Sequence, residues 1–143
     1  MERTLVLIKP DGVERNLIGE IIRRFESGGL KVRDMKMAAP KKEFVETHYA
    51  MHRGKPFFDL LIKYLANRQV VAMVLEGKDA VAIVRKIVGA TDPSKADKGT
   101  IRGDLGNDSR EKADREHRSI YNLIHASGTK DEAKAELKLW FGK

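Results

Sequence analysis

The sequence contains no cysteine and no long hydrophobic run. The missing cysteines exclude disulfide bonds, thiol nucleophiles and cysteine-ligated metal sites. No apolar stretch approaches the roughly 20 residues that a membrane-spanning helix needs. The first residues, Met1 to Thr4, are not followed by the hydrophobic core of a signal peptide. We therefore expect a cytoplasmic protein that has no membrane partner.

The residues that are present fit a globular protein. The chain has 143 residues, of which 41% are hydrophobic and 34% are charged. This length is enough for one domain with a real core, so we expect residues 1–143 to form a single domain. The formal net charge of +7 predicts an anionic partner, either nucleotide phosphate or nucleic acid. Solubility would explain the same charge, and the total alone does not separate these explanations.

The apolar pattern predicts the strands. Residues 4–8 and 70–75 are continuous apolar runs, which are typical of central strands buried on both faces. Residues 30–37 alternate, with a change of parity near Arg33 and Asp34 that predicts a β-bulge. A short apolar run predicts a last strand at residues 121–124.

Helical spacing fills the intervals between these strands. The helical segments are expected at residues 17–25, 40–66 with an interruption at 53–56, 80–88, and 129–141, which begins with a capping box at residues 129–132. The resulting order is strand, helix, strand, helices, strand, helix, long loop, strand, helix. It predicts an α+β fold of the ferredoxin-like split βαβ type, with a four-stranded antiparallel sheet and covering helices.

The long polar loop, about residues 91–121, is unusual in a compact domain, where such loops are usually functional or disordered. Residues 109–117 within it could form a polar helix. Its glycine-rich part, Gly99 to Asp104, would let the backbone approach a ligand, and Arg102 could bind phosphate oxygens. No glycine-lysine-serine sequence follows, so this is not a P-loop.

His125 is the most informative single residue, because it ends the last apolar run just before the capping box. An imidazole is both a nucleophile and a leaving group near neutral pH. The amides at the start of the following helix would favour phosphate beside it. A lone histidine is more often structural, so this interpretation needs cations from elsewhere in the chain.

Two cations and one aromatic residue are candidates for such a site. Lys9 follows a buried strand, and ligands tend to bind at strand ends, although a surface lysine there is equally ordinary. Arg85 on a helix would usually be solvated. Tyr49, Phe57 and Phe58 are core aromatics by default, whereas an exposed Phe57 would stack on a nucleobase.

The other histidines, His48, His52 and His117, are expected to be surface or structural residues. No pair of histidines with a carboxylate forms a convincing metal site in the sequence.

Together these segments resemble nucleoside diphosphate kinases along most of the chain. The matching segments are Thr4–Val13, Gly19–Ile22, His48–Tyr49, Lys55–Phe58, Val70–Val74, Gly89–Pro93, Gly99–Asp104 and Asn122–Ser127. The resemblance implies a ferredoxin-like fold and transfer of a γ-phosphoryl group between nucleotides. It also implies ping-pong kinetics and broad base specificity.

The resemblance implies a role for each matching residue. His125 would be the nucleophile that becomes phosphohistidine, with Glu136 and Ser127 holding its far ring nitrogen. The phosphates would bind Lys9, Arg85, Thr91 and Arg102, with Tyr49 near the transferred group; the ribose would bind Lys9 and Asn122; the base would bind Phe57 and Leu61. Mg²⁺ would be carried by the nucleotide phosphates, without a protein ligand.

The chain departs from the family pattern in three places. Gly128 stands where most members carry aspartate, while Thr129 keeps a hydroxyl group. The stretch from Arg102 to Asn122 is longer than the family's. The sequence stops at Lys143, where many relatives continue with an arm that helps hold the oligomer. The family forms homo-oligomers, tetramers or hexamers built from dimers, and we expect the same kind of assembly here.

Asn122 and His125 would point to opposite faces of a regular strand. Both can reach one site only if Asn122 still belongs to the loop, so we expect the strand to start after it.

Two alternatives to an active kinase remain. The +7 charge would also suit a nucleic-acid or regulatory binding module, but the aliphatic central strands lack the exposed aromatics of RNA-binding domains with similar topology. A family member that has lost catalysis is the other alternative. The joint presence of Lys9, Arg85, Arg102, His125 and Glu136 argues against it.

Overall fold

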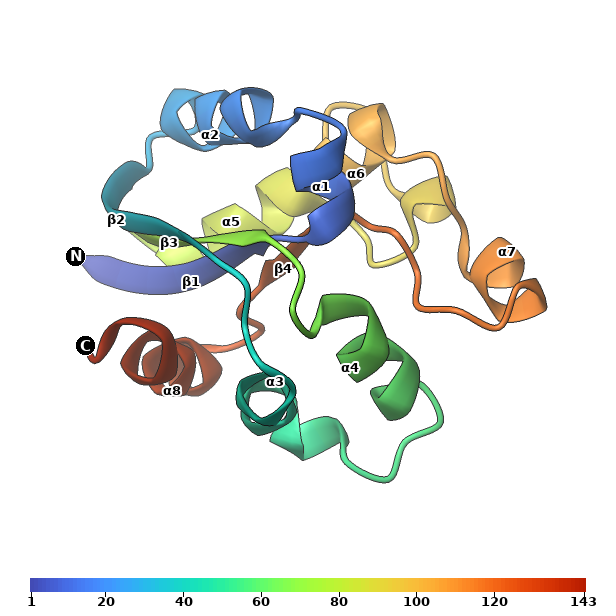
Figure 1. Cartoon of the computed structure of the whole chain (residues 1–143). Coiled ribbons are helices and arrows are strands. Elements are labelled where there is room, and N and C mark those ends of the chain that lie inside the picture. Colours follow the sequence, from blue (N-terminus) through green and yellow to red (C-terminus); the bar gives the residue numbers. More distant parts are fainter.

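The computed structural model describes all residues from Met1 to Lys143, and Figure 1 shows the arrangement of its helices and strands. In chain order the elements are β1 (Glu2–Ile8), α1 (Pro10–Glu14), α2 (Ile18–Ser27), β2 (Lys31–Ala38), α3 (Lys42–His48), the 3₁₀ helix η1 (Ala50–His52), α4 (Phe58–Leu65), β3 (Val70–Gly77), α5 (Ala80–Val88), the 3₁₀ helix η2 (Pro93–Lys95), α6 (Ile101–Leu105), α7 (Arg110–Arg115), β4 (Ile124–Ala126) and α8 (Lys130–Phe141).

The four strands form one sheet in the order β2-β3-β1-β4, and every neighbouring pair is antiparallel. This confirms the predicted α+β fold of the ferredoxin-like type. The N- and C-termini lie at one end of the molecule, and α7 lies at the other end (Figure 1).

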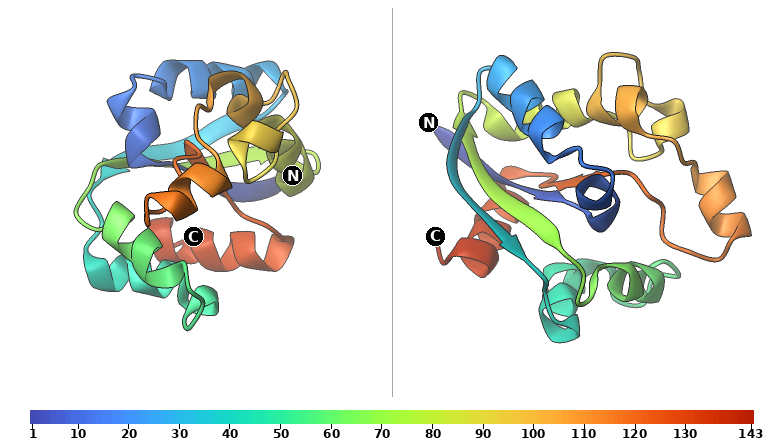
Figure 2. Two further views of the ribbon diagram at one scale, coloured as in Figure 1. Left: turned by 90° about the vertical axis from the view of Figure 1, so that its right-hand side faces the viewer. Right: turned by 45° about the horizontal axis from the view of Figure 1, so that its top comes forward.

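The sheet separates two hydrophobic cores, because alternate residues of the central strands point to opposite faces. Val6 and Ile8 of β1 pack with α2 and α5, whereas Leu5 and Leu7 pack with α3, α4 and α8. Figure 2 shows these two layers of helices with the sheet between them. The continuous apolar runs in β1 and β3 therefore reflect burial on both faces, as predicted.

Two irregularities expected from the sequence are present. The pairing of β2 with β3 shifts register between Val32 and Asp34, where the parity changes. The helical region of residues 40–66 is divided into α3 and α4 by η1 and a turn. No helix of the structure is both long and apolar enough to cross a membrane.

The last strand was predicted at the wrong residues. It runs from Ile124 to Ala126, not from residue 121. Leu123 cannot continue a regular strand because its φ is +72°. This conformation is held by two bonds from the N-terminal segment: Lys9 N donates to Leu123 O (2.8 Å), and Leu123 N donates to the Asp11 carboxylate (3.0 Å). Asn122 therefore lies in the loop, as expected.

The segment of residues 91–121 contains more regular structure than predicted. Helix α7 agrees with the expected polar helix and is capped by the Ser109 hydroxyl, whereas η2 and α6 were not anticipated. The buried Asp108 carboxylate accepts from Arg118 (2.7 Å) and from the backbone of Tyr121 (2.8 Å). These hydrogen bonds join the residues before and after α7 and fix the position where the chain continues to Asn122.

Candidate active site

One cavity of about 380 Å³ brings together nearly all the predicted site residues. Its lining includes Lys9, Tyr49, Leu61, Arg85, Thr91, Arg102, Asn122, His125 and Glu136, and it also includes His48, Met51, His52, Ala126, Gly128 and Glu132. These residues come from the end of β1, the region from α3 to α4, α5, the long polar segment, β4 and α8. Two predicted residues lie outside this lining: Ser127 contacts Glu136, and Phe57 lies on the outer surface nearby.

His125 sits in the middle of β4, opposite Leu7 of β1, and is fixed by its far ring nitrogen. Its Nε2 lies 2.8 Å from Oε1 of Glu136, and the Ser127 hydroxyl donates to the same oxygen at 2.8 Å. With Glu136 ionised, Nε2 carries the proton and Nδ1 keeps its lone pair. The arrangement leaves Nδ1 as the nucleophilic atom of the ring.

The environment keeps this imidazole neutral. Burial, followed by the charges of Lys9, Arg102 and Arg85, lowers the pKa of His125 to about 3. The lone pair is therefore present at neutral pH without a separate base. Burial raises the pKa of Glu136, while His48 and the Ser127 hydroxyl act in the opposite direction.

Lys9 directly follows β1 and is a buried cation. Its Nζ donates to Oδ1 of Asn122 at 2.9 Å, and Nδ2 of Asn122 donates to the Thr91 carbonyl at 3.0 Å. Burial and the nearby Arg102 lower the pKa of Lys9 to about 7. Without a bound phosphate, this ammonium group is therefore near its titration point at neutral pH.

The two arginines differ in how firmly they are held. Arg102 donates from Nε to Asn122 O (3.0 Å), from one terminal nitrogen to Gly89 O (3.1 Å) and from the other to Ile124 O. Burial lowers its pKa to about 10, so it stays charged. Arg85 makes one long bond of 3.4 Å to Ala126 O. Arg85 is therefore freer to turn towards a ligand.

The default prediction that all three aromatic residues belong to the core is right for two of them and wrong for Phe57. Tyr49 and Phe58 are buried, whereas Phe57 is 38% exposed. The rings of Phe57 and His52 lie 5.2 Å apart, and Leu61 of α4 lines the cavity below them. The Tyr49 ring lies 5.8 Å from that of His125, and its buried hydroxyl has no protein partner. An exposed aromatic face beside an apolar wall can accept a planar ring of either purine or pyrimidine type.

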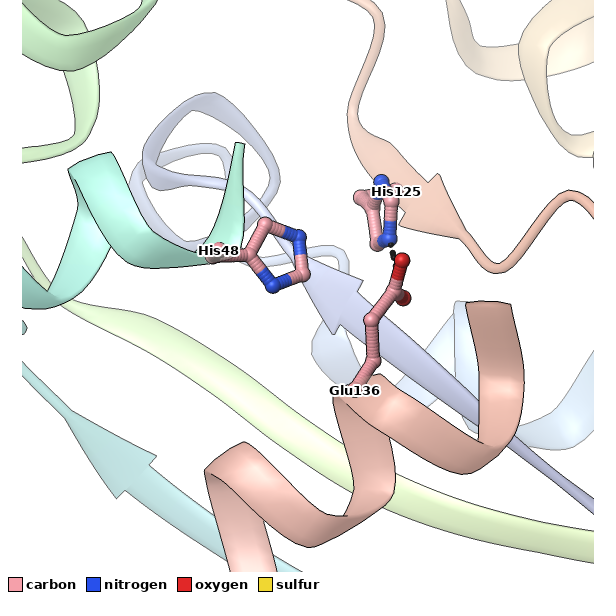
Figure 3. Close-up of side chains that lie close together, drawn as sticks. All are labelled: His48, His125 and Glu136. Atoms are coloured by element: carbon pink, nitrogen blue, oxygen red, sulfur yellow. Dashed lines mark hydrogen bonds and ion pairs between the residues drawn. The ribbon is translucent and has the colours of Figure 1, made fainter. Parts of the chain in front are cut away.

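His48 was expected at the surface or in a structural role, and it is buried beside His125. Its ring centroid is 4.7 Å from that of His125. Potential ligand atoms of His48, His125 and Glu136 all lie within 4.8 Å of one another (Figure 3), a grouping of two histidines and a carboxylate that the sequence analysis did not find. The only signal for burial was helical spacing, because His48 lies three residues after the buried Val45 on α3.

Glu132 is a second residue that the sequence analysis missed. The backbone amide of Gly128 donates to its carboxylate at 2.9 Å. A Cβ atom at position 128 would lie only 2.4 Å from the same oxygen. Glu132 therefore occupies the space beside Gly128, where the family resemblance implied an aspartate.

Comparisons with known proteins point to one family. The family model described as "Nucleoside diphosphate kinase" matches residues 2–143. A nucleoside diphosphate kinase of Pyrococcus furiosus is 54% identical over 141 residues, which cover 99% of this chain and 83% of that protein.

Solved structures give the same result. A nucleoside diphosphate kinase of Borrelia burgdorferi, described as a transition-state mimic with bound vanadate and ADP, superposes with a TM-score of 0.94 at 39% identity, covering 98% of this chain and 86% of the other. One of Halobacterium salinarum in complex with CDP gives a TM-score of 0.87 at 44% identity, covering 99% and 88%. The chain belongs to the nucleoside diphosphate kinase family.

Proposed function

We propose that this protein transfers the γ-phosphate of a nucleoside triphosphate to a nucleoside diphosphate through a phosphohistidine at His125. The observation that carries this proposal is the hydrogen bond between His125 Nε2 and Glu136 in a cavity lined by Lys9, Arg85 and Arg102. It leaves one unprotonated ring nitrogen among three cationic side chains. The vanadate and ADP bound to the Borrelia relative support the same reaction.

The first half-reaction forms one bond and breaks one. Nδ1 of His125 attacks the γ-phosphorus, and the bond from phosphorus to the β–γ bridging oxygen breaks. The diphosphate leaves with the electron pair on that oxygen. The ring now carries a positive charge, which the Glu136 carboxylate stabilises through the Nε2 proton. The second half-reaction reverses these steps with another diphosphate as acceptor.

The cations stabilise charge on the moving phosphoryl group. Phosphoryl transfer depends mainly on in-line positioning and on stabilising the oxygens of the transferred group. Lys9, Arg85 and Arg102 supply that stabilisation, the Thr91 hydroxyl binds the phosphates with them, and the Tyr49 hydroxyl lies near the transferred group. Ser127 assists by holding Glu136 in place. One nucleophile and one nucleotide cavity imply that the donor leaves before the acceptor enters, which is ping-pong kinetics.

Mg²⁺ fits this site only together with the nucleotide. The phosphate end of the cavity is lined by three cations, which would repel a free divalent ion. The ion would therefore be held by the nucleotide phosphates, without a protein ligand. When bound it would neutralise part of the charge on those oxygens.

The nucleoside lies towards the outer surface. Phe57 stacks on the base and Leu61 lines the same apolar slot, while Lys9 and Asn122 bind the ribose hydroxyls. Stacking accepts any base, so broad base specificity follows. The CDP bound to the Halobacterium relative is consistent with this arrangement.

Assembly and location complete the proposal. The protein forms a homo-oligomer, a tetramer or hexamer built from dimers, and works in the cytoplasm as a single domain of residues 1–143. Met35 and Met37 on the edge strand β2 are 49% and 54% exposed, and an interface between copies would cover them. Size-exclusion chromatography with light scattering measures the molar mass of the assembly directly.

The deciding experiment is phosphorylation of the intact protein. Incubation with Mg-ATP labelled in the γ-phosphate should leave about one phosphate per chain, labile in acid and stable in base. His125→Ala should remove the label, and CDP or GDP should discharge it from the wild-type protein. Absence of label on folded wild-type protein would refute the proposal.

A further inference from the structure

Helix α8 holds two histidines at once. Glu136 contacts His125, and Trp140, one turn further along α8, donates from its indole Nε1 to Nδ1 of His48 at 2.9 Å. Figure 3 shows the rings of His48 and His125 approaching the Glu136 carboxylate from two different elements. The orientation of both rings is therefore set by the same helix.

The bond from Trp140 determines which nitrogen of His48 carries the proton. An indole nitrogen can only donate, so Nδ1 of His48 must accept with its lone pair. Burial lowers the pKa of His48 to about 3, which keeps the ring neutral. Its single proton is therefore on Nε2. This nitrogen is buried, has no hydrogen-bond partner, and faces His125 and Glu136 (Figure 3).

This protonation state argues against a metal centre formed by the three residues. A metal ligand needs a free lone pair on Nε2, but that nitrogen carries a proton as long as Trp140 donates to Nδ1. His48 thus presents a hydrogen-bond donor, and the Glu136 carboxylate offers an acceptor whose potential ligand atom lies within 4.8 Å.

A donor in this place can shift the equilibrium between two protonation states of the Glu136–His125 pair. If Glu136 is ionised, Nε2 of His125 donates to it and Nδ1 keeps its lone pair. If Glu136 is protonated, it donates to Nε2 instead, and the ring proton moves to Nδ1. The second state removes the nucleophile. An N–H group directed at the pair favours the ionised carboxylate.

We propose that His48 is a positioning residue of this site, whose Nε2–H keeps Glu136 ionised and thereby keeps the lone pair on Nδ1 of His125. This inference rests on the proposed function. His48 acts through Glu136, and Trp140 acts through His48.

Other polar and charged groups also surround the pair. They include Ser127 after β4, Lys9 after β1, Arg85 on α5, Arg102 on α6, Tyr49 after α3, His52 on η1, Glu132 on α8, and Thr91 and Asn122 of the polar segment. All of them stay unchanged in variants at position 48. A change in the protonation of Glu136 or His125 in such variants therefore reports on His48.

Two substitutions at position 48 distinguish the roles of the two ring nitrogens. His48→Asn keeps an acceptor close to the position of Nδ1, so Trp140 retains its partner, but it removes the Nε2 donor. His48→Gln is the matched control, because its longer amide places an N–H donor close to the position of Nε2. Trp140→Phe frees His48 to carry its proton on Nδ1, and should resemble His48→Asn if it folds.

The first measurement is the pH dependence of phosphohistidine formation from Mg-ATP in single turnover. In His48→Asn the acidic limb should move to higher pH, with a rate loss of about tenfold on that limb and little change in KM. His48→Gln should recover most of the rate. A purely structural role of His48 would lower the rate equally at all pH values and would not distinguish Asn from Gln.

The second measurement needs no turnover. ¹⁵N NMR of His125 in the nucleotide-free protein should show Nε2 protonated in the wild type, and a growing Nδ1–H population in His48→Asn as the pH falls. Unchanged His125 signals and an unchanged acidic limb in His48→Asn would overturn the inference. Because the NMR titration is independent of catalysis, it distinguishes failure of this inference from failure of the proposed kinase reaction.

Discussion

Nucleotide binding should draw a proton onto Lys9. In the free protein, burial and Arg102 lower the pKa of this ammonium group to about 7, whereas its ordinary value is 10.5. A bound phosphate is an adjacent anion, which favours the charged form and should raise the pKa back towards its ordinary value. Binding of ADP is then coupled to proton uptake at any pH between these two values.

The size of the uptake follows from the two pKa values. At pH 8 free Lys9 is only about one-tenth protonated, and bound Lys9 is almost fully protonated, so about 0.9 proton should enter per site. Affinity for ADP should be highest below pH 7. It should fall by up to tenfold per unit as the pH rises from about 7 towards the pKa of the complex.

Calorimetric titration with Mg-ADP at pH 8, in buffers that differ in ionisation enthalpy, measures this number directly. ADP avoids turnover, and its own phosphates are already deprotonated at this pH. Lys9→Arg is the control, since a guanidinium group stays charged and should bind with almost no uptake. An uptake below about 0.2 proton in the wild type, or equal uptake in Lys9→Arg, would refute this reasoning.

Three further substitutions test other parts of the site. Glu136→Gln should slow phosphohistidine formation by about 10- to 100-fold in single turnover, because a charged acceptor is lost, while KM stays nearly constant. Phe57→Ala should raise KM for nucleotides by about tenfold through loss of stacking, with kcat little changed, in steady-state assays. Gly128→Ala should lower the free energy of unfolding by about 1 kcal/mol, because the new Cβ displaces the Glu132 carboxylate. The double variant Gly128→Ala/Glu132→Ala, which lacks that carboxylate, should recover part of this loss.

The regular parts of the fold were predictable because their periodicity is set by burial. β1 and β3 face two cores, which requires continuous apolar runs, and the parity change in β2 marked its bulge. Helix α1 was missed because Lys9-Pro10-Asp11-Gly12 is typical of a turn. Its conformation is supported by a distant residue, Tyr64. The Asp11 backbone amide donates to the Tyr64 hydroxyl, and that hydroxyl donates to the Asp11 carboxylate.

The individual residues of the site were predictable from the sequence, but the contacts that hold them in place were not. Local signals pointed to His125, to Lys9 after β1 and to Arg102 in the polar loop, whereas Arg85 on α5 was expected only from the family resemblance. The position of β4 depends on Leu123, whose left-handed backbone is held by Asp11 from far along the chain. His48 depends on Trp140, which is 92 positions away. No local pattern in the sequence encodes either contact.

Arg102 stabilises the scaffold in addition to its proposed role as a phosphate ligand. Its guanidinium group joins three backbone carbonyls, those of Gly89, Asn122 and Ile124; this leaves two of its five N–H groups for a substrate. In a lineage that had lost catalysis, replacing Arg85 would remove only one long hydrogen bond. Replacing Arg102 would leave those three carbonyls without their hydrogen-bond donor. Among sequences drifting away from activity, we expect this arginine to be among the last of the cations to disappear.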